Sequence, residues 1–231
     1  MMKIIILAAG MGTRLNLNAP KCLTELFTKE TILDRQLESL SHHVDKKDII
    51  VVVGYKSDLI KAKYHDYCFV ENLNYKNTNT AKSLLLALNN IDSNNNIVWL
   101  NGDVVFDKEI IKFLIKSTKS SMLVNSGVVG EEEVKYKINK DGTIKSVSKI
   151  INDGLGEAVG LNRINRNDLK KFKLCLEKCA NDDYFEKAIE LLINQGSKVY
   201  PIDISDYFCC EIDTKEDLNS VNTYLKENLN D

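Results

Sequence analysis

The chain has 231 residues, of which 44% are hydrophobic and 28% charged, a composition that is ordinary for a globular protein and excludes wholesale disorder. Its net charge of −2 gives no basic excess, so we expect no nucleic-acid partner. The longest apolar runs, Ile4–Ala9 and Ile49–Val53, are too short to span a bilayer, so we expect no membrane anchor. The first run continues into Gly10 without a cleavage site, which argues against a signal peptide. Six cysteines without a CxxC pair predict free thiols, and together these features predict a cytoplasmic protein.

Strand-like and helix-like segments alternate through the first half of the chain. Short β-branched apolar runs predict strands over Lys3–Ala8, Asp48–Gly54, Cys68–Val70, Ile97–Asn101 and Met122–Asn125. Helical spacing of apolar residues predicts helices over Thr31–His42, Ser57–Tyr64 with Ser57 as its cap, Thr80–Asn90 and Asp107–Ser117. Strand, helix and strand joined by short connections indicate parallel βαβ units.

The pattern changes near residue 130. Strand-like segments over Val134–Asn139 and Thr143–Ile150 flank Lys140-Asp141-Gly142, which predicts a hairpin. The remaining expected strands are Val159–Ile164, Lys198–Ile204 and Phe208–Ile212, and the remaining helices are Asn167–Cys179, Asp182–Asn194 and Thr214–Asn228. We therefore expect an α/β fold: a doubly wound, mostly parallel (Rossmann-like) sheet with helices on both faces and an added β-hairpin region.

A glycine-containing loop follows the first strand, with the sequence Leu7-Ala8-Ala9-Gly10-Met11-Gly12-Thr13-Arg14. Small residues let a backbone approach a ligand closely, and successive N–H groups can then point at phosphate oxygens. The guanidinium of Arg14 suits phosphate, and Lys21 behind Pro20 supplies a second cation. A plain tight turn is the alternative. A dinucleotide fingerprint is excluded because Leu15 replaces its third glycine, and the Gly-Lys-Ser/Thr of a P-loop is absent.

Carboxylates stand at the ends of two predicted strands. Asp103 follows Asn101-Gly102, at the carboxyl edge where open parallel sheets bind ligands. Near the other end of the chain, Thr214 and Asp217 have the spacing of a capping box, which leaves Asp213 available for another role. Alternation places Glu211 on the same face as Asp213, although a buried hydrogen-bonding role for Glu211 is an equal alternative.

The Leu-Ala-Ala-Gly-x-Gly-Thr-Arg-Leu sequence, followed by Pro-Lys, resembles the signature of nucleotidyltransferases, which make activated sugars and small alcohols from a nucleoside triphosphate. The resemblance implies that the glycine loop and Arg14 hold the triphosphate while Lys21 acts at the α-phosphate. It also implies Mg²⁺ as the cofactor, held by Asp103 and Asp213, since Mg²⁺ prefers carboxylate oxygens. The implied catalytic residues are Lys21, Arg14 and Asp103. The implied nucleotide-binding residues are these three with Leu7, Ala8, Ala9, Gly10, Gly12 and Thr13.

The segment from Asn72 to Leu84 lacks the Gly-Thr usual in sugar-nucleotide members. Its Tyr-x-x-Thr-Asn-x-x-x-Ser-Leu pattern resembles the cytidylyltransferase branch, which uses CTP on phosphocholine, aminoethylphosphonate or phosphoglutamine. The resemblance adds Thr78, Asn79 and Ser83 to the nucleotide-binding residues, with Asn79 and Ser83 placed to read the pyrimidine. Helix capping by Thr78 or Thr80 is the alternative.

The second half carries Ser148-Lys149-Ile150, Gly156-Glu157-Ala158-Val159-Gly160 and Asp183-Tyr184-Phe185-Glu186, which recur in that branch. We expect a single domain over 1–231, with a nucleotide-binding half (1–130) and an acceptor-binding half (131–231). The branch often has a Trp where Cys209-Cys210 stand, and this leaves the acceptor open. The candidate acceptor-binding residues are Lys137, Lys149, Glu157, Asp183, Tyr184, Glu186 and Glu211.

The sequence thus predicts a CTP-dependent cytidylyltransferase that transfers CMP to a small phosphorylated acceptor and releases pyrophosphate. Phosphoglutamine is the preferred acceptor by resemblance, in the setting of capsule or cell-surface polysaccharide synthesis. A sugar-1-phosphate nucleotidyltransferase is one alternative, and a non-catalytic nucleotide-sensing domain of the same fold is another. The sequence leaves a monomer and a homodimer equally open.

Overall fold

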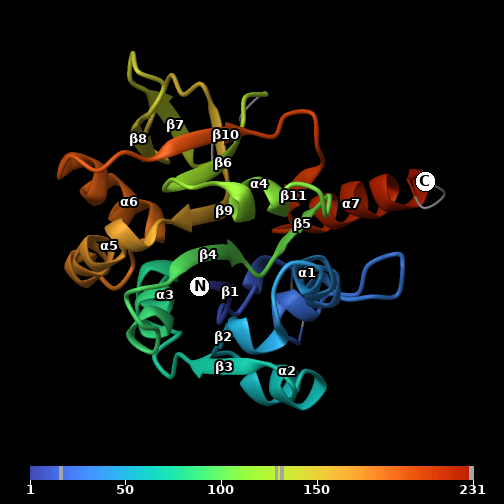
Figure 1. The fold of residues 1–231 in the computed structure, drawn as a ribbon. Helices are drawn as coiled ribbons and strands as arrows, with labels where there is room; N and C mark the ends of the chain where they lie inside the picture. The colour runs from blue at the N-terminus through green and yellow to red at the C-terminus, as the bar shows by residue number, and fades with distance from the viewer. Residues whose placement is uncertain (16–17, 128–129, 131–132, 229–231) are drawn as a thin grey trace.

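The computed structural model describes residues 1–15, 18–127, 130 and 133–228 (Figure 1). Its strands are β1 (Met2–Ala8), β2 (Ile49–Val53), β3 (Cys68–Glu71), β4 (Asn96–Asn101), β5 (Val104–Phe106), β6 (Ser121–Asn125), β7 (Lys135–Ile138), β8 (Ile144–Ser148), β9 (Gly156–Ile164), β10 (Tyr200–Asp203) and β11 (Cys209–Glu211). Its α-helices are α1 (Ile32–Ser41), α2 (Ser57–Lys63), α3 (Thr80–Asn89), α4 (Ile111–Lys116), α5 (Arg166–Lys178), α6 (Phe185–Asn194) and α7 (Lys215–Glu227). Three short 3₁₀ helices are η1 (Thr13–Leu15), η2 (Lys21–Leu23) and η3 (Lys46–Asp48). Among the described helices, none combines the length and the apolar character that crossing a membrane requires.

The main sheet has the strand order β10-β6-β9-β4-β1-β2-β3. Strands β4, β1, β2 and β3 run parallel, as the βαβ pattern predicts. Strand β9 runs antiparallel to both of its neighbours, β4 and β6, because the β7–β8 hairpin rather than a helical crossover leads into it. The hairpin joins the sheet through β7, which pairs with β9. The predicted doubly wound, mostly parallel sheet with a hairpin region is therefore confirmed, with one internal strand reversed.

Both faces of the sheet are covered, which explains the continuous apolar runs of its central strands. In β1, the side chains of Ile5 and Leu7 pack with α3, α5 and α6, whereas those of Ile4 and Ile6 pack with α1, α2 and α4. Figure 1 shows the two helical layers on opposite sides of the sheet. Trp99, in β4, is fully buried between Phe172 and Phe185 on the first of these faces.

A second, two-stranded sheet pairs β5 with β11 antiparallel. Its residues Val105 and Ile212 pack with Val221 and Leu225 of α7 in a separate apolar cluster. The stacked rings of Phe208 and Tyr224, with centroids 3.8 Å apart, also hold α7 against this sheet. The last helix therefore supports a sheet that joins the middle of the chain to its end.

Three local predictions are wrong, and each gave way to a tertiary contact. Residues 104–106 form strand β5, and α4 begins at Ile111 rather than Asp107, because the Asp107 carboxylate accepts hydrogen bonds from the Phe208 amide and the Tyr224 hydroxyl. Helix α6 begins at Phe185 rather than Asp182, because the Phe185 amide donates to the Thr80 hydroxyl of α3 at 3.0 Å. Ser57 does not cap α2; its hydroxyl donates to the Glu71 carboxylate from the next strand.

Candidate active site

A cavity of about 460 Å³ opens at the carboxyl ends of β1 and β4. Both halves of the chain contribute to its wall. Its lining residues are Leu7, Ala8, Gly10, Gly12, Arg14, Lys21, Cys22, Asn79, Thr80, Asn101, Gly102, Asp103, Glu133, Val134, Lys149, Ala158, Gly160, Tyr184, Phe185, Glu186, Glu211, Asp213, Thr214 and Asp217. The cavity lies at the sheet edge where α/β folds bind ligands.

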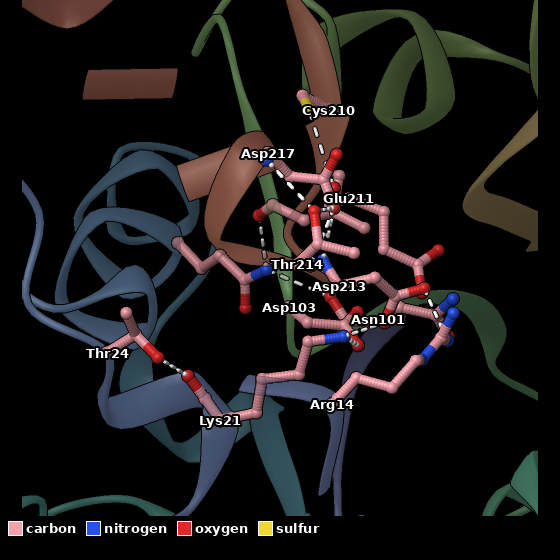
Figure 2. A network of polar contacts seen from close by, with 12 residues as sticks. Arg14, Lys21, Thr24, Asn101, Asp103, Cys210, Glu211, Asp213, Thr214 and Asp217 are labelled. Carbon is pink, nitrogen blue, oxygen red and sulfur yellow. Dashed lines mark hydrogen bonds and ion pairs between the residues drawn. The ribbon is translucent and has the colours of Figure 1, made fainter. Parts of the chain in front are cut away.

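The glycine loop packs directly on Lys21. Gly12 has a φ of +59°, and a Cβ atom added there would lie 2.8 Å from the Lys21 Cβ atom, so a larger residue would be strained and would displace the lysine. Pro20 leads into η2, where the Thr24 hydroxyl donates to the Lys21 carbonyl at 2.7 Å (Figure 2). The loop and the short helix therefore hold the Lys21 side chain in one direction, into the cavity.

The ammonium of Lys21 joins two carboxylates that are distant in sequence. Its Nζ donates to Asp103 Oδ2 at 2.8 Å and also to Asp213 Oδ1 (Figure 2). Only 11% of the Lys21 side chain is exposed. Burial lowers the pKa of Lys21, but the Asp103 and Asp213 carboxylates outweigh this effect and leave the pKa above its ordinary value. The lysine side chain is therefore protonated at neutral pH.

The pairing of β5 with β11 brings Asp103 and Asp213 together. The Ile212 amide donates to the Asp103 carbonyl at 2.9 Å, directly beyond the last pair of that ladder. On the other side, Thr214 and Asp217 form the predicted capping box of α7. Asp217 Oδ2 also accepts from the Asp213 amide at 2.9 Å, which fixes the backbone of the residue that points at Lys21.

Arg14 lies on the outer side of this cluster. Its Nη2 donates to Asp213 Oδ2 at 2.6 Å, and its side chain is 56% exposed. Because an ion pair that is largely exposed contributes little free energy, the guanidinium can reorient toward an incoming anion at a small cost in free energy. The cavity therefore has two cations on one side, and both are anchored on Asp213.

Carboxylate oxygens of Asp103, Glu211 and Asp213 all lie within 4.8 Å of one another. Asp103 Oδ1 is buried and has no hydrogen-bond partner within the described residues. Desolvation, together with the Asp103 and Asp213 carboxylates, raises the pKa of Glu211 to about 8. Three carboxylates, one of which has an unpartnered buried oxygen, provide hard oxygen donors that fit a divalent cation such as Mg²⁺.

One residue that positions the site, Gln36, was not predicted from the sequence. It lies on α1, is 1% exposed, and its Nε2 donates to the carbonyls of Asn101 at 2.9 Å and Val104 at 2.8 Å. These two carbonyls flank Asp103 in the chain, so Gln36 fixes the turn that carries this carboxylate. The signal in the sequence is a glutamine on the helix face that also carries Leu33, Leu37 and Leu40.

Most of the predicted loop residues reach the cavity. Leu7, Ala8, Gly10 and Gly12 line it. Ala9 is not in its wall, and its carbonyl accepts from the Tyr55 amide at 3.1 Å. The side chain of Thr13 lies outside the part of the chain that the structure describes.

The predicted pyrimidine-reading residues are divided. Asn79 lines the cavity, where its side chain also caps α3 by accepting from the Thr80 amide. Thr78 and Ser83 are not in the described wall, because their hydroxyls accept from Asn72 Nδ2 at 2.9 and 3.0 Å. The structure therefore brings Asn79, and not Thr78 or Ser83, to the site.

The predicted acceptor residues are divided in the same way. Lys149, Tyr184, Glu186 and Glu211 line the cavity. The Lys149 ammonium lies 4.9 Å from the centroid of the Tyr184 ring.

Three other predicted acceptor residues are absent from the described wall: Lys137, Glu157 and Asp183. Lys137 is paired with Asp153 at 2.5 Å, and Asp183 accepts from the Ala180 amide at 2.7 Å. Burial and the Glu133 carboxylate raise the pKa of Glu157 to about 7. Lys137 and Asp183 thus contact local partners in this structure.

Known proteins resemble this chain in sequence and in fold. The sequence profile of the MobA-like NTP transferase domain matches residues 4–133, more than half of the chain. Bifunctional protein GlmU of Methanococcus vannielii is 29% identical over 244 residues, covering 99% of this chain and 56% of that protein. The chain thus spans about half of that curated relative's length.

Two solved structures share the fold along almost the whole chain. The CTP:phosphocholine cytidylyltransferase of Streptococcus pneumoniae has a TM-score of 0.80 at 23% identity, covering 97% of this chain and 99% of its own. The inositol-1-phosphate CTP transferase of T. maritima has a TM-score of 0.78 at 20% identity, covering 99% and 97%. At these identities the likeness shows the fold.

Proposed function

This chain belongs to the MobA-like NTP transferase domain family, and from that premise we propose that it is a cytidylyltransferase that transfers CMP from CTP to a small phosphorylated acceptor. The observation that carries the proposal is the convergence of Arg14, Lys21, Asp103 and Asp213 on one side of a single cavity. We call these four residues the phosphate side. The Lys149, Tyr184 and Glu186 wall is the α6 side, because Glu186 lies in the first turn of α6.

In the proposed reaction an oxygen of the acceptor phosphate forms a bond to the α-phosphorus of CTP, while the bond to the β-phosphate oxygen breaks and pyrophosphate leaves. The protein holds the two reactants in line and stabilises the charge that develops at the α-phosphate, with no covalent intermediate. Lys21 is the buried cation for that charge, and the more exposed Arg14 holds the outgoing phosphates.

Asp103 and Asp213 would hold Mg²⁺, with Glu211 beside them. The unpartnered Asp103 Oδ1 and the three-oxygen donor set fit this ion. When bound, Mg²⁺ supplies charge neutralisation of the triphosphate. The role of the chain is to keep both carboxylates at one point, which the β5–β11 pairing and Gln36 accomplish.

Two features support CTP as the nucleotide. The Tyr75–Leu84 segment lacks the Gly-Thr of sugar-nucleotide members, and Asn79 from this segment lies in the cavity wall. Both of the solved structures described above are named for CTP-using transferases. Phosphoglutamine, aminoethylphosphonate and phosphocholine are the candidate acceptors.

A sugar-1-phosphate nucleotidyltransferase is the second candidate. Its support is the 29% identity with Bifunctional protein GlmU, which extends over nearly the whole of this chain. A nucleotide-sensing domain without catalysis is less well supported, because Arg14, Lys21 and Asp103 are all present and converge on one cavity.

Pyrophosphate release, measured for each common nucleoside triphosphate against these acceptors and against sugar-1-phosphates, tests the proposal. We expect turnover with CTP and a small phosphorylated acceptor, and none from the Asp103→Asn variant prepared in parallel. Faster turnover with UTP or dTTP would favour the second candidate. Nucleotide binding without pyrophosphate release under any combination would favour the sensing domain.

A further inference from the structure

The α6 side of the cavity contains a buried carboxylate with one oxygen that lacks a hydrogen-bond donor. Glu186 is 7% exposed, and its Oε2 has no partner within the described residues. Burial raises the pKa of Glu186 to about 7, although the nearby Lys149 ammonium acts in the opposite direction. A buried carboxylate oxygen without a donor destabilises the protein, so a ligand that donates to this oxygen makes a hydrogen bond that the folded chain does not provide.

A second unpartnered acceptor lies in the same cavity wall. Asn101 Oδ1 is buried and has no hydrogen-bond partner within the described part of the chain. The β4 strand that carries Asn101 also carries Trp99, which contacts Phe185 beside Glu186. The wall thus offers acceptors, and a complementary ligand must offer donors.

The aromatic residues of the wall do not form a cage for a quaternary ammonium. Within the described lining they are Tyr184 and Phe185. The Tyr184 ring already contacts the Lys149 ammonium at 4.9 Å from its centroid. Phe185 packs edge-on against Trp99, with ring centroids 5.6 Å apart, and Trp99 is 0% exposed. A trimethylammonium group needs several free aromatic faces and has no N–H to donate.

We propose that Glu186 binds a primary ammonium group of the acceptor, so that the substrate class is an aminoalkyl phosphate or phosphonate with its amine seated against α6. This rests on the proposed function. Lys149 and Glu186 present opposite charges to a zwitterionic acceptor: the lysine suits its phosphate and the glutamate its ammonium. Among the candidate acceptors, phosphoglutamine and aminoethylphosphonate carry a primary ammonium group and phosphocholine does not.

Phosphoethanolamine and phosphocholine form a matched pair of probes, because they differ only by three N-methyl groups. The test compares kcat/KM for the two probes, with CTP and Mg²⁺ present. We expect the wild type to prefer phosphoethanolamine by about 10- to 100-fold, the size of one charge-assisted hydrogen bond. An equal rate, or a preference for phosphocholine, would overturn the inference and leave the proposed function intact.

Glu186→Gln removes the charge and keeps the shape of the side chain. We expect it to lower kcat/KM for phosphoethanolamine far more than kcat/KM for phosphocholine, so that the preference falls to within a few-fold. Glu190→Gln is the control, since Glu190 lies one turn further along α6, pairs with Lys187 at 2.7 Å and is absent from the described wall. An unchanged preference in Glu186→Gln would contradict the assignment.

Equilibrium binding separates this inference from the proposed function. If no acceptor supports pyrophosphate release, the proposed function fails, and phosphoethanolamine binding is then measured by saturation-transfer NMR. Binding to the wild type that is at least about 10-fold tighter than to Glu186→Gln supports the ammonium site. Equal affinity, or no binding to either protein, overturns it.

Discussion

The phosphate side of the cavity has four charged residues and the α6 side has two, Lys149 and Glu186, and the two sets are paired differently. On the phosphate side, Lys21 joins Asp103 to Asp213, and Arg14 contacts Asp213 as well. On the α6 side, one oxygen of Glu186 has no donor among the described residues. An anionic ligand on the first side must therefore compete with ion pairs that already exist, although Asp103 Oδ1 remains unpartnered there for a cation, whereas a donor on the second side completes a missing interaction.

This difference indicates that the phosphate side contributes mainly to the reaction rate and the α6 side mainly to specificity for the acceptor. Lys21 and Arg14 are ion-paired in the free protein. A cation of this kind raises the rate most where it stabilises charge that develops in the transition state. A buried unpaired acceptor discriminates instead between ligands that can donate to it and those that cannot. The predictions below separate these two kinds of contribution, beginning with the largest effect.

Replacement of Lys21 tests the phosphate side most directly. We expect Lys21→Met to lower kcat and kcat/KM together by about 10²–10³-fold, because its ammonium is buried beside the carboxylates where the α-phosphate is proposed to lie. Lys187→Met, an exposed lysine of α6 outside the described wall, is the matched control. Steady-state kinetics within a few-fold of wild type would reduce Lys21 to a structural ion-pair partner.

Replacement of Gln36 tests whether its hydrogen bonds to the turn that carries Asp103 are needed for metal binding. We expect Gln36→Leu to raise the Mg²⁺ concentration for half-maximal rate by about 10- to 100-fold, the effect typical of residues that orient a metal ligand. The rate should recover largely at saturating Mg²⁺. Leu37→Ala, a neighbouring core variant, should cost about 2–5 kcal/mol in the free energy of unfolding without this metal shift. A shift of equal size in both variants would attribute the effect to stability alone.

Arg14 sharpens the contrast within the phosphate side. Because its side chain is 56% exposed, it can contact the phosphates equally in the ground and transition states. We expect Arg14→Ala to raise the KM for CTP by about 10-fold, the lower end of the range for one charged hydrogen bond, with a smaller change in kcat. Initial rates at varied CTP give both constants. A kcat loss as large as that of Lys21→Met would show that the two cations act as one unit.

Asp34 provides a reference outside the cavity, where ion pairing affects stability and not catalysis. Burial raises the pKa of Asp34, but donors from Lys63, Thr31 and Tyr64 outweigh it and leave the pKa below its ordinary value. Its stabilising effect is therefore present above about pH 4 and is lost as pH falls through the folded pKa. We expect Asp34→Ala to lower the free energy of unfolding by about 1 kcal/mol at pH 7, as for loss of a helix cap.

Denaturant titrations of wild type and Asp34→Ala at several pH values check this prediction. The difference between the two proteins should shrink toward acid, while their activities at neutral pH stay equal. A difference that grows toward acid would reverse the sign of the assignment.

Local sequence signals predicted much of the fold correctly, and the errors share a cause. The strand at β1, the hairpin around Gly142 and the capping box at Thr214 each depend on residues close together in the chain. Strand β5 was missed because its three residues have too little pattern to predict a strand; it exists because β11 and α7 pack against it. Ser57 was misassigned because its hydroxyl can accept from a helix N–H or donate to a carboxylate, and folding brings the Glu71 carboxylate within reach.

The sequence by itself identified the residues of the phosphate side. Loop composition and positions at strand ends are local properties, and with the resemblance to nucleotidyltransferases they singled out Gly12, Arg14, Lys21, Asp103 and Asp213. Only the tertiary structure decided that Asp213 meets Asp103, that Thr78 and Ser83 face Asn72, and that one oxygen of Glu186 lies buried without a donor. Pairing of distant strands and burial both depend on the whole packed chain, since a side chain's partners and its access to water are set by segments far away in sequence.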